Sequence, residues 1–372
     1  MTHVRHVLGI SGGKDSAALA IYMRQRYPEL DIEYYTCDTG RELEATYQLI
    51  DNLEIYLGKP IKRLRAAENS TQTPFDHYLR LYGGYLPSSQ SRWCTKKLKL
   101  DPFEAFVGND PVISYVGIRG DEDREGYISK KTNIQSIFPF RRNLWSEDVV
   151  GKVLGNPHAD LVADLYQTIA PTARPTGVNE RFAEVLSKPT SFSFPQAQKL
   201  NLLLDLDTRL FNRLVYAYLQ QTAYPLAQEP TFPLIDNDEA LVRDDIFRLL
   251  RDSGVGVPAY YEKLDFSVNG KQGQYARSRS GCFFCFYQQK IEWIWLYEQH
   301  PDRFAEAMTY EKDGYSWDDS ETLAQMTQPA RIQAIKEEYI KRTTRNAQKT
   351  KSPYLLDILG DAEGEGCAAC FI

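Results

Sequence analysis

Long apolar segments are missing from this chain of 372 residues. No run approaches the roughly 18 uninterrupted apolar residues that a membrane-spanning helix needs, so we expect no membrane protein. An excess of basic residues is missing too, because the net charge is -6 and the sequence pI is about 5.6. Proteins that bind nucleic acid over a wide surface carry a positive footprint, so any such binding here has to be local.

We also expect no signal peptide, because the first residues lead at once into the apolar run 4–10, which predicts a strand. We therefore expect a cytoplasmic protein. Only six cysteines are present, and in a reducing compartment they are thiols or metal ligands rather than disulfides. The length exceeds a typical single domain, so we expect one core of roughly 200 residues with an insertion or a second domain.

The sequence S-G-G-K-D-S at positions 11–16 lies between this strand and a helical pattern at 17–27. It has neither the spacing of a Walker loop nor that of a dinucleotide-binding fold. Two glycines permit a tight turn that approaches a ligand closely, and the first N–H groups of a helix attract negative charge. Ser11 and Ser16 add hydroxyl groups, and Lys14 adds a charge. The pattern predicts a phosphate-binding loop, with an ordinary glycine turn as the competing interpretation.

Strand and helix patterns alternate over the first 140 residues, which is typical of a doubly wound, mostly parallel α/β sheet. Further strands are expected at residues 32–36, 61–64 and 112–116, and helices at about 42–57 and from Thr73 onward. Ligands of such sheets bind outside the carboxyl ends of the strands. Three strand ends should therefore bring polar residues to one edge: the loop at 11–16, the stretch 38–40 and the stretch 119–124.

These three stretches resemble the PP-loop ATP pyrophosphatase superfamily, whose members share the adenine nucleotide α-hydrolase-like fold and cleave ATP between its α and β phosphates. The stretch D-T-G-R-E-L-E-A-T at 38–46 is similar to the segment after the second strand in phosphoadenosine phosphosulfate (PAPS) reductase-like proteins. Ala45 stands where that family has glutamate, so Glu44 is the neighbouring substitute. The stretch G-I-R-G-D-E-D-R at 117–124 resembles the family's arginine motif, with the second arginine one position early.

The resemblance implies roles for particular residues. Lys14, Asp15 and Arg119 are the expected catalytic residues, and Arg119 would stabilise the charge that develops as pyrophosphate leaves. Asp15 either positions Mg²⁺ or only caps the helix. The residues expected to bind ATP and its Mg²⁺ are Ser11, Gly12, Gly13, Lys14, Asp15, Ser16, Asp38, Thr39, Gly40, Glu44, Gly117, Arg119 and Arg124.

Cysteine spacing indicates a metal site. Cys282 and Cys285 form a Cys-x-x-Cys pair, whose two thiolates can converge on one soft metal centre. Iron–sulfur members of the resembled family carry two adjacent cysteines earlier in the chain, where this sequence has Trp93 and Cys94. The resemblance therefore implies an iron–sulfur cluster, with structural zinc or a buried apolar turn as alternatives.

The tail offers a fourth ligand through Cys367 or Cys370. Two alternatives remain open: the tail pair is a mobile dithiol that carries sulfur or electrons, or one iron is left open for an exogenous sulfide. The basic run at 341–351 just before the tail is either a local phosphate-binding patch or a solvated helix end.

Residues 151–232 carry no chemical motif, and their long helical stretches, such as 196–221, predict a helical insertion whose apolar stripe is core. The expected division is a nucleotide-binding core at 1–150, a helical insertion at 151–232, a cysteine-motif region at 233–310 that completes the catalytic domain, and a C-terminal helix and tail at 311–372. Residues 232–246 and 254–261 also resemble the family segment that precedes its cysteine motif, and the earlier stretch 139–149, with Pro139-Phe140, Trp145 and Asp148-Val149, resembles the same feature.

The region around the Cys-x-x-Cys pair, through about residue 304, is similar to PAPS reductase-like proteins of DNA phosphorothioation and phage defence. That resemblance implies an ATP pyrophosphatase that adenylates a nucleic-acid oxygen for sulfur insertion, with DNA favoured over tRNA. A cysteine desulfurase would supply the sulfur, and a multi-protein modification or defence complex is the implied setting. The alternatives are a sulfonucleotide reductase, a tRNA thiolase, and a nucleotide-binding subunit without catalysis.

Overall fold

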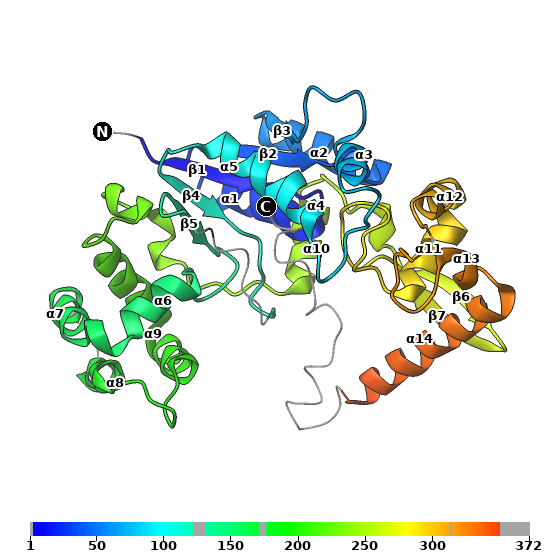
Figure 1. Cartoon of the computed structure of the whole chain (residues 1–372). Coiled ribbons are helices and arrows are strands. Elements are labelled where there is room, and N and C mark those ends of the chain that lie inside the picture. Colours follow the sequence, from blue (N-terminus) through cyan, green and yellow to red (C-terminus); the bar gives the residue numbers. More distant parts are fainter. Residues whose placement is uncertain (1–2, 123–128, 130, 171–175, 313, 350–372) are drawn as a thin grey trace.

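The computed structural model of the chain describes residues 3–122, 129, 131–170, 176–312 and 314–349. A five-stranded parallel sheet lies at its centre (Figure 1), with the strand order β3-β2-β1-β4-β5. The strands are β1 (Arg5–Gly9), β2 (Ile32–Asp38), β3 (Ile61–Arg65), β4 (Val112–Tyr115) and β5 (Ile134–Ile137). Because β1 lies between β2 and β4, the strand order reverses beside β1, where ligands of open α/β sheets bind.

Helices cover both faces of this sheet. In the order of the chain they are α1 (Lys14–Arg26), α2 (Glu44–Leu57), α3 (Pro74–Leu81), α4 (Trp93–Thr95), the π-helical turn η1 (Lys96–Leu100) and α5 (Asp101–Val107). Leu8 of β1 packs with α1 and α2 in the largest hydrophobic cluster, whereas Val7 packs with Phe103 of α5 on the other face. This alternation of buried side chains is the pattern of a strand that is covered on both sides.

A group of helices follows β5 and lies beside that edge of the sheet, drawn in green in Figure 1. It contains α6 (Glu147–Leu154), η2 (Asn156–His158), α7 (Ala159–Ile169), α8 (Thr176–Ser187), α9 (Gln196–Leu219), η3 (Pro225–Gln228) and η4 (Pro233–Asp236). Apolar residues of α9 such as Leu214 and Phe211 join the largest hydrophobic cluster. The apolar stripe of this segment is therefore core, as its spacing predicts.

In the remaining chain, α10 (Arg243–Asp252) lies near the middle of the molecule, whereas the elements drawn from yellow to red lie on the right, away from the green helices (Figure 1). This part of the chain also contains η5 (Ala259–Tyr261), the antiparallel pair β6 (Leu264–Val268) and β7 (Lys271–Tyr275), α11 (Lys290–Gln299), α12 (Pro301–Thr309), α13 (Leu323–Met326) and α14 (Pro329–Lys349). Of these helices, α10 packs against α1.

A second hydrophobic core joins this C-terminal region to the segment around α3 and α4. The ring of Phe75 in α3 lies 5.4 Å from that of Trp93 and 4.4 Å from that of Phe284, between ring centroids. Phe284 in turn stacks on Trp317 at 4.9 Å. Segments 180 or more residues apart in the sequence are thus held together next to the sheet, because their aromatic side chains share one core.

The structure confirms the doubly wound parallel α/β fold and the helical character of residues 151–232. The strands predicted at 32–36, 61–64 and 112–116 are present as β2, β3 and β4. The sequence did not predict β5 or the pair β6 and β7. Among the described residues, no helix is both long and apolar enough to cross a membrane.

Candidate functional site

The loop after β1 forms a tight turn at the amino end of α1. Gly12 has a φ of 73°, a left-handed conformation that favours glycine. A Cβ atom on Gly12 would lie 2.2 Å from Thr46 Cγ2, so the close packing of α2 also requires glycine here. Within the turn, the Ser16 hydroxyl accepts a hydrogen bond from Ser11 N at 3.1 Å and lies 3.0 Å from the Ser11 hydroxyl. The predicted loop therefore exists at the exit of the first strand.

Lys14, Asp15 and Arg119 form one buried chain of charges. Lys14 Nζ lies 2.9 Å from Asp15 Oδ2, and Arg119 Nη1 lies 2.9 Å from Asp15 Oδ1. Arg119 also contacts the carboxylates of Asp121 at 2.8 Å and Glu122 at 3.0 Å. The residues Lys14, Asp15 and Arg119 are 4%, 7% and 3% exposed. The structure thus brings together the three residues that the sequence predicts to be catalytic.

Burial would raise the pKa of Asp15, but the charges of Lys14 and Arg119 outweigh burial and lower it. Asp15 is therefore a carboxylate held by two cations. Gly117 makes this arrangement possible, since a Cβ atom there would lie 3.0 Å from the main-chain oxygen of Asp15. Gly117 thus lets the chain that follows β4 approach the first turn of α1.

Side chains from the C-terminal region cover the loop. The hydroxyl of the buried Tyr260 donates a hydrogen bond to Gly12 O at 2.9 Å, and the hydroxyl of Tyr261 accepts one from Lys14 N at 3.5 Å. A Cβ atom on Gly13 would lie 2.5 Å from Ser280 Oγ. Sequence reasoning missed all three side chains. Tyr260 and Tyr261 end the stretch 254–261 that resembles the family, but nothing local to them indicates a contact with residue 12.

The loop after β2 carries a second group of acids. Asp38 Oδ1 accepts hydrogen bonds from Gly40 N at 2.8 Å and from the Tyr47 hydroxyl at 3.0 Å. The same Tyr47 hydroxyl contacts Glu42 Oε2 at 2.9 Å, and Thr39 donates to Glu42 Oε1 at 2.6 Å. The carboxylate that accompanies Asp38 is therefore Glu42.

The sequence predicts Glu44 as a ligand for ATP or its Mg²⁺. Glu44 is exposed in the first turn of α2. Residue 42 lies in the extended loop before the helix and faces the strand ends, whereas residue 44 has entered the helix and faces solvent. Loss of hydration raises the pKa of Glu42, and the charge of the neighbouring Asp38 raises it further. Hydrogen bonds from Thr39 and Tyr47 lower this pKa, but they do not cancel the rise.

Three of the five cysteines predicted as metal ligands, Cys94, Cys282 and Cys285, line one small cavity of about 50 Å³. Cys94 comes from α4, and Cys282 and Cys285 come from the loop before α11. This loop is fixed to the loop after β2, because Phe283 N donates to Arg41 O at 2.9 Å. The sulfur of Cys282 also lies 3.2 Å from the Thr39 hydroxyl.

The chemistry of these thiols suits a soft metal centre. Burial raises the pKa of the Cys282 thiol, and the charge of Glu42 raises it further, so this sulfur is a protonated thiol unless a metal binds it. In the described part of the chain, no group of three or more cysteine, histidine or acidic side chains is spaced to hold a metal ion. The three thiols therefore share a cavity without forming a closed set of ligands.

The cysteine cavity and the loop after β1 are neighbours through Ser280. This residue lines the cavity and also contacts the position of Gly13. Two arginines contact residues that line the cysteine cavity. Arg277 is buried and donates to Cys282 O at 3.1 Å, and the guanidinium of Arg279 lies 5.6 Å from the ring centre of Tyr287. Arg277 Nε and Arg279 Nη1 are buried and have no hydrogen-bond partner among the described residues. An anion would satisfy them.

Three predicted site residues, Arg124, Cys367 and Cys370, lie outside the described residues. Of the other cysteines, Cys37 is buried on the α5 face of the sheet, as expected for a small apolar side chain. Trp293, Trp295 and Phe304 are buried in the core, whereas Tyr297 of the same helical stretch is 38% exposed.

Comparison with known proteins gives two findings. Residues 5–142 match the model of the phosphoadenosine phosphosulfate reductase domain. An uncharacterized protein of Methanocaldococcus jannaschii is 34% identical over 145 residues, which cover 36% of this chain and 28% of that relative. The chain therefore matches less than a third of the relative's length, and the name of that relative states no activity. Residues 5–142 are therefore similar to a phosphoadenosine phosphosulfate reductase domain of the PP-loop superfamily, and this similarity indicates nucleotide binding and sulfur-related chemistry.

Proposed function

We propose that this protein is an ATP pyrophosphatase that adenylates an oxygen of a nucleic acid so that sulfur can replace that oxygen. The favoured acceptor is an oxygen of a DNA backbone phosphate. The observation that carries the proposal is the contact between two sites. Ser280 touches the loop after β1 and also lines the cavity of Cys94, Cys282 and Cys285. A nucleotide bound at the loop and a sulfur carried at the thiols would therefore lie close together.

The loop would bind the phosphates of ATP through the main-chain N–H groups of residues 12–16 at the amino end of α1. Lys14 and Arg119 would face the negative charge that develops as pyrophosphate leaves. Both cations are already fixed by Asp15, so little reorganisation is needed when that charge forms. Mg²⁺ would bind at Asp15 or Asp38, since carboxylate oxygens are its preferred protein ligands.

The reaction has two steps. The acceptor oxygen attacks the α phosphorus of ATP, the bond to the β phosphate breaks, and pyrophosphate leaves. A sulfide sulfur then attacks the activated acceptor, and AMP leaves with the oxygen that was replaced. A cysteine desulfurase would be the sulfide source, and other proteins of a modification or defence complex would present the nucleic acid.

An iron–sulfur cluster is proposed at Cys94, Cys282 and Cys285, and it would present sulfur or tune an electron transfer when bound. Zinc is the alternative metal for the same thiols. The fourth ligand is proposed to come from Cys367 or Cys370. Iron and acid-labile sulfide measured after anaerobic purification should be present in the wild type and lost in Cys282→Ser. Iron that stays bound to the Cys282→Ser protein would contradict the assignment.

An anionic acceptor is supported by two unpartnered guanidinium nitrogens beside the cavity. Arg277 Nε and Arg279 Nη1 are buried without a hydrogen-bond partner among the described residues. A buried cationic N–H that lacks an acceptor costs roughly 1–3 kcal/mol or more, and a phosphate oxygen would remove that cost. The net charge of -6 makes this local group of arginines the relevant surface for an anion.

The test is product analysis with ATP and Mg²⁺, with DNA or tRNA as acceptor and a sulfide source present. AMP and pyrophosphate should appear, and mass spectrometry should find sulfur in the DNA. Lys14→Gln should lower pyrophosphate release by a factor of about 100 or more. Lys59→Gln is the matched control, because the partners of Lys59 among the described residues are the exposed Asp31 and Ile32 O, at the far end of the sheet.

The match to a phosphoadenosine phosphosulfate reductase domain favours a second candidate, a sulfonucleotide reductase. In that case the nucleotide itself carries the sulfur, and a thiol attacks it. Sulfite released from a sulfonucleotide, without pyrophosphate release from ATP, would support the reductase. ATP binding without any turnover would instead support a nucleotide-binding subunit, and sulfur found in tRNA alone would support a tRNA thiolase.

A further inference from the structure

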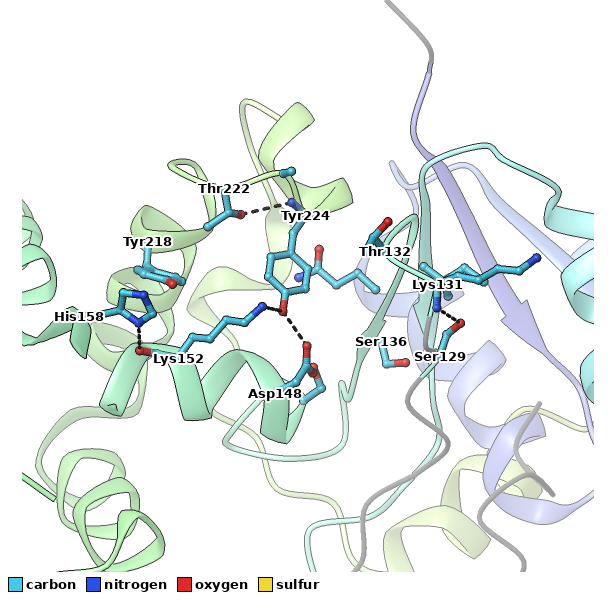
Figure 2. Close-up of a pocket in the computed structure, with 14 residues that line it drawn as sticks. Ser129, Lys131, Thr132, Ser136, Asp148, Lys152, His158, Tyr218, Thr222 and Tyr224 are labelled. Atoms are coloured by element: carbon cyan, nitrogen blue, oxygen red, sulfur yellow. Dashed lines mark hydrogen bonds between the residues drawn. The ribbon is translucent and has the colours of Figure 1, made fainter. Parts of the chain in front are cut away.

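A second cavity, of about 470 Å³, lies between the edge strand β5 and the helical segment that follows it (Figure 2). It is lined by Ser129, Lys131, Thr132, Ile134, Gln135, Ser136, Ser146, Asp148, Lys152, His158, Tyr218, Thr222, Ala223 and Tyr224. None of these residues belongs to the loop after β1 or lines the cysteine cavity. Its volume is within the range of roughly 300–1,000 Å³ that is usual for small-molecule sites.

The cavity wall holds a buried amide group with an unused donor. Gln135 is 2% exposed, and its Oε1 accepts a hydrogen bond from Leu226 N at 3.0 Å. Gln135 Nε2 is buried and has no hydrogen-bond partner among the described residues. Native proteins seldom leave such a group unpaired, because its lost hydration is not repaid. A ligand that offers an acceptor would pair it.

The other polar groups of the cavity are mostly donors. Lys152 Nζ donates to the Tyr224 hydroxyl at 2.7 Å and has two further N–H groups. Ser146 and Ser136 are buried, and Ser146 stands at the amino end of α6, where its side chain makes no capping hydrogen bond. These hydroxyls, the ammonium and the amide favour an acceptor-rich, negatively charged group.

The acidic and basic neighbours do not reverse this preference. Asp148 Oδ2 already accepts a hydrogen bond from the Tyr224 hydroxyl at 2.6 Å, and Lys152 contacts the same hydroxyl, so these two charges offset one another. Lys131 Nζ lies 3.3 Å from Glu104, and its side chain points away from Tyr224 in Figure 2. His158 Nδ1 contacts Lys152 O at 2.9 Å.

We propose that this cavity binds a small molecule through an oxyanion, either a carboxylate or a phosphate group, with Gln135 and Lys152 as its principal donors. The rings of Tyr218 and Tyr224 form side walls against which the body of the ligand can pack. The site is separate from the proposed ATP site, so its failure would leave the proposed function untouched.

Calorimetric titration of the full chain tests this with three probes: AMP, citrate and inorganic phosphate. At least one probe should bind at this cavity, and the pattern identifies the oxyanion. If AMP and phosphate bind but citrate does not, the cavity recognises a phosphate group. If citrate alone binds, it recognises a carboxylate, and if all three bind, it accepts both kinds of oxyanion. Because AMP and phosphate can also bind the loop after β1, variants must locate each binding event.

The diagnostic variant is Gln135→Glu. It keeps an acceptor for Leu226 N but replaces the donor with a negative charge, so probe binding should weaken by roughly tenfold or more. Lys152→Gln should also weaken it, and it serves if Gln135→Glu does not fold. Lys131→Gln is the matched control, since it removes the same charge from a side chain that points away.

Two results would overturn the proposal. One is that none of the probes binds the wild type. The other is that every binding event keeps its affinity in Gln135→Glu and Lys152→Gln but is lost in Lys14→Gln, which would assign all binding to the loop after β1.

Discussion

Two carboxylates, Asp15 and Glu42, stand at the ends of neighbouring strands, and their surroundings differ. Asp15 follows β1 and lies between the cations of Lys14 and Arg119, which lower its pKa. Glu42 follows β2 and has no cation within ion-pair distance among the described residues, so loss of hydration raises its pKa. Its carboxylate instead accepts hydrogen bonds from Thr39, Tyr47 and the main chain.

Under the proposed function, this difference would suit the first strand end to phosphate chemistry and the second to a metal or a carried sulfur. Beside β1, two fixed cations prepare a place where negative charge can form. Beside β2, neutral donors hold an acid next to the thiol of Cys282, and burial together with the charge of Glu42 raises the pKa of that thiol.

Asp15→Asn should have the largest effect, because it leaves Lys14 and Arg119 buried without their shared partner. We expect a loss of about 3 kcal/mol in the free energy of unfolding at pH 7, measured by urea denaturation. The pKa of Asp15 is below its ordinary value of 3.8, so its contribution is present above that pH and is lost as the pH falls further. The difference between wild type and variant should therefore shrink below about pH 4. A difference that grows on acidification would contradict the ion network.

Gly12→Ala should come second, since it disturbs the packing that joins the two strand ends. A Cβ atom there would overlap Thr46 of α2, the helix that follows Glu42, and Gly12 has a left-handed φ. We expect a loss of about 2 kcal/mol in the free energy of unfolding. Gly58→Ala is the control for backbone strain alone, because Gly58 has a φ of 63° and a Cβ atom there would meet no atom within 4 Å. This variant should lower the free energy of unfolding by about 1 kcal/mol. Equal losses in the two variants would mean that the Thr46 contact does not matter.

Glu42→Gln should change stability by less than Asp15→Asn, within about 1 kcal/mol of the wild type. No cation is left unpaired, and the loss of the accepted bond from Arg41 N is offset by removal of a poorly hydrated charge. Denaturation at pH 7 measures this. A loss as large as that of Asp15→Asn would show that the two acids are equivalent, and the contrast between the strand ends would fail.

Tyr261→Phe should have the smallest effect. It removes only the hydroxyl that lies 3.5 Å from Lys14 N, a long hydrogen bond, so the melting temperature should hardly change. Because this hydroxyl occupies a position where a phosphate oxygen would bind, the affinity for ATP and Mg²⁺ should stay equal or rise. Calorimetric titration measures it, and a clear fall in affinity would mean that Tyr261 binds the nucleotide directly.

The sequence predicts the loop after β1 well, because its signal is local: an apolar strand, two glycines and a helix in succession. It does not predict Glu42, whose role depends on Tyr47 and on Cys282, 240 residues away. It also does not predict β5, where Gln135 and Ser136 interrupt the apolar pattern of a buried strand. Local physics is visible in one segment, whereas these features depend on partners that only the fold brings together.

The meeting of Cys94 with the Cys-x-x-Cys pair shows the same limit. Spacing alone connects Cys282 with Cys285, and only the family resemblance adds Cys94. The physical cause is the aromatic core of Phe75, Trp93 and Phe284, which joins the two segments. That core cannot be read from the spacing of cysteines, because it depends on which aromatic residues pack together in three dimensions.

The most direct measurement is a crystal structure of the protein with Mg²⁺ and an ATP analogue that cannot be cleaved between the α and β phosphates. We expect the triphosphate against the N–H groups of residues 12–16, with Lys14 and Arg119 facing it and the Tyr261 hydroxyl displaced from Lys14 N. An analogue bound elsewhere, or a loop still covered by Tyr260, Tyr261 and Ser280 with no nucleotide, would contradict the proposed function.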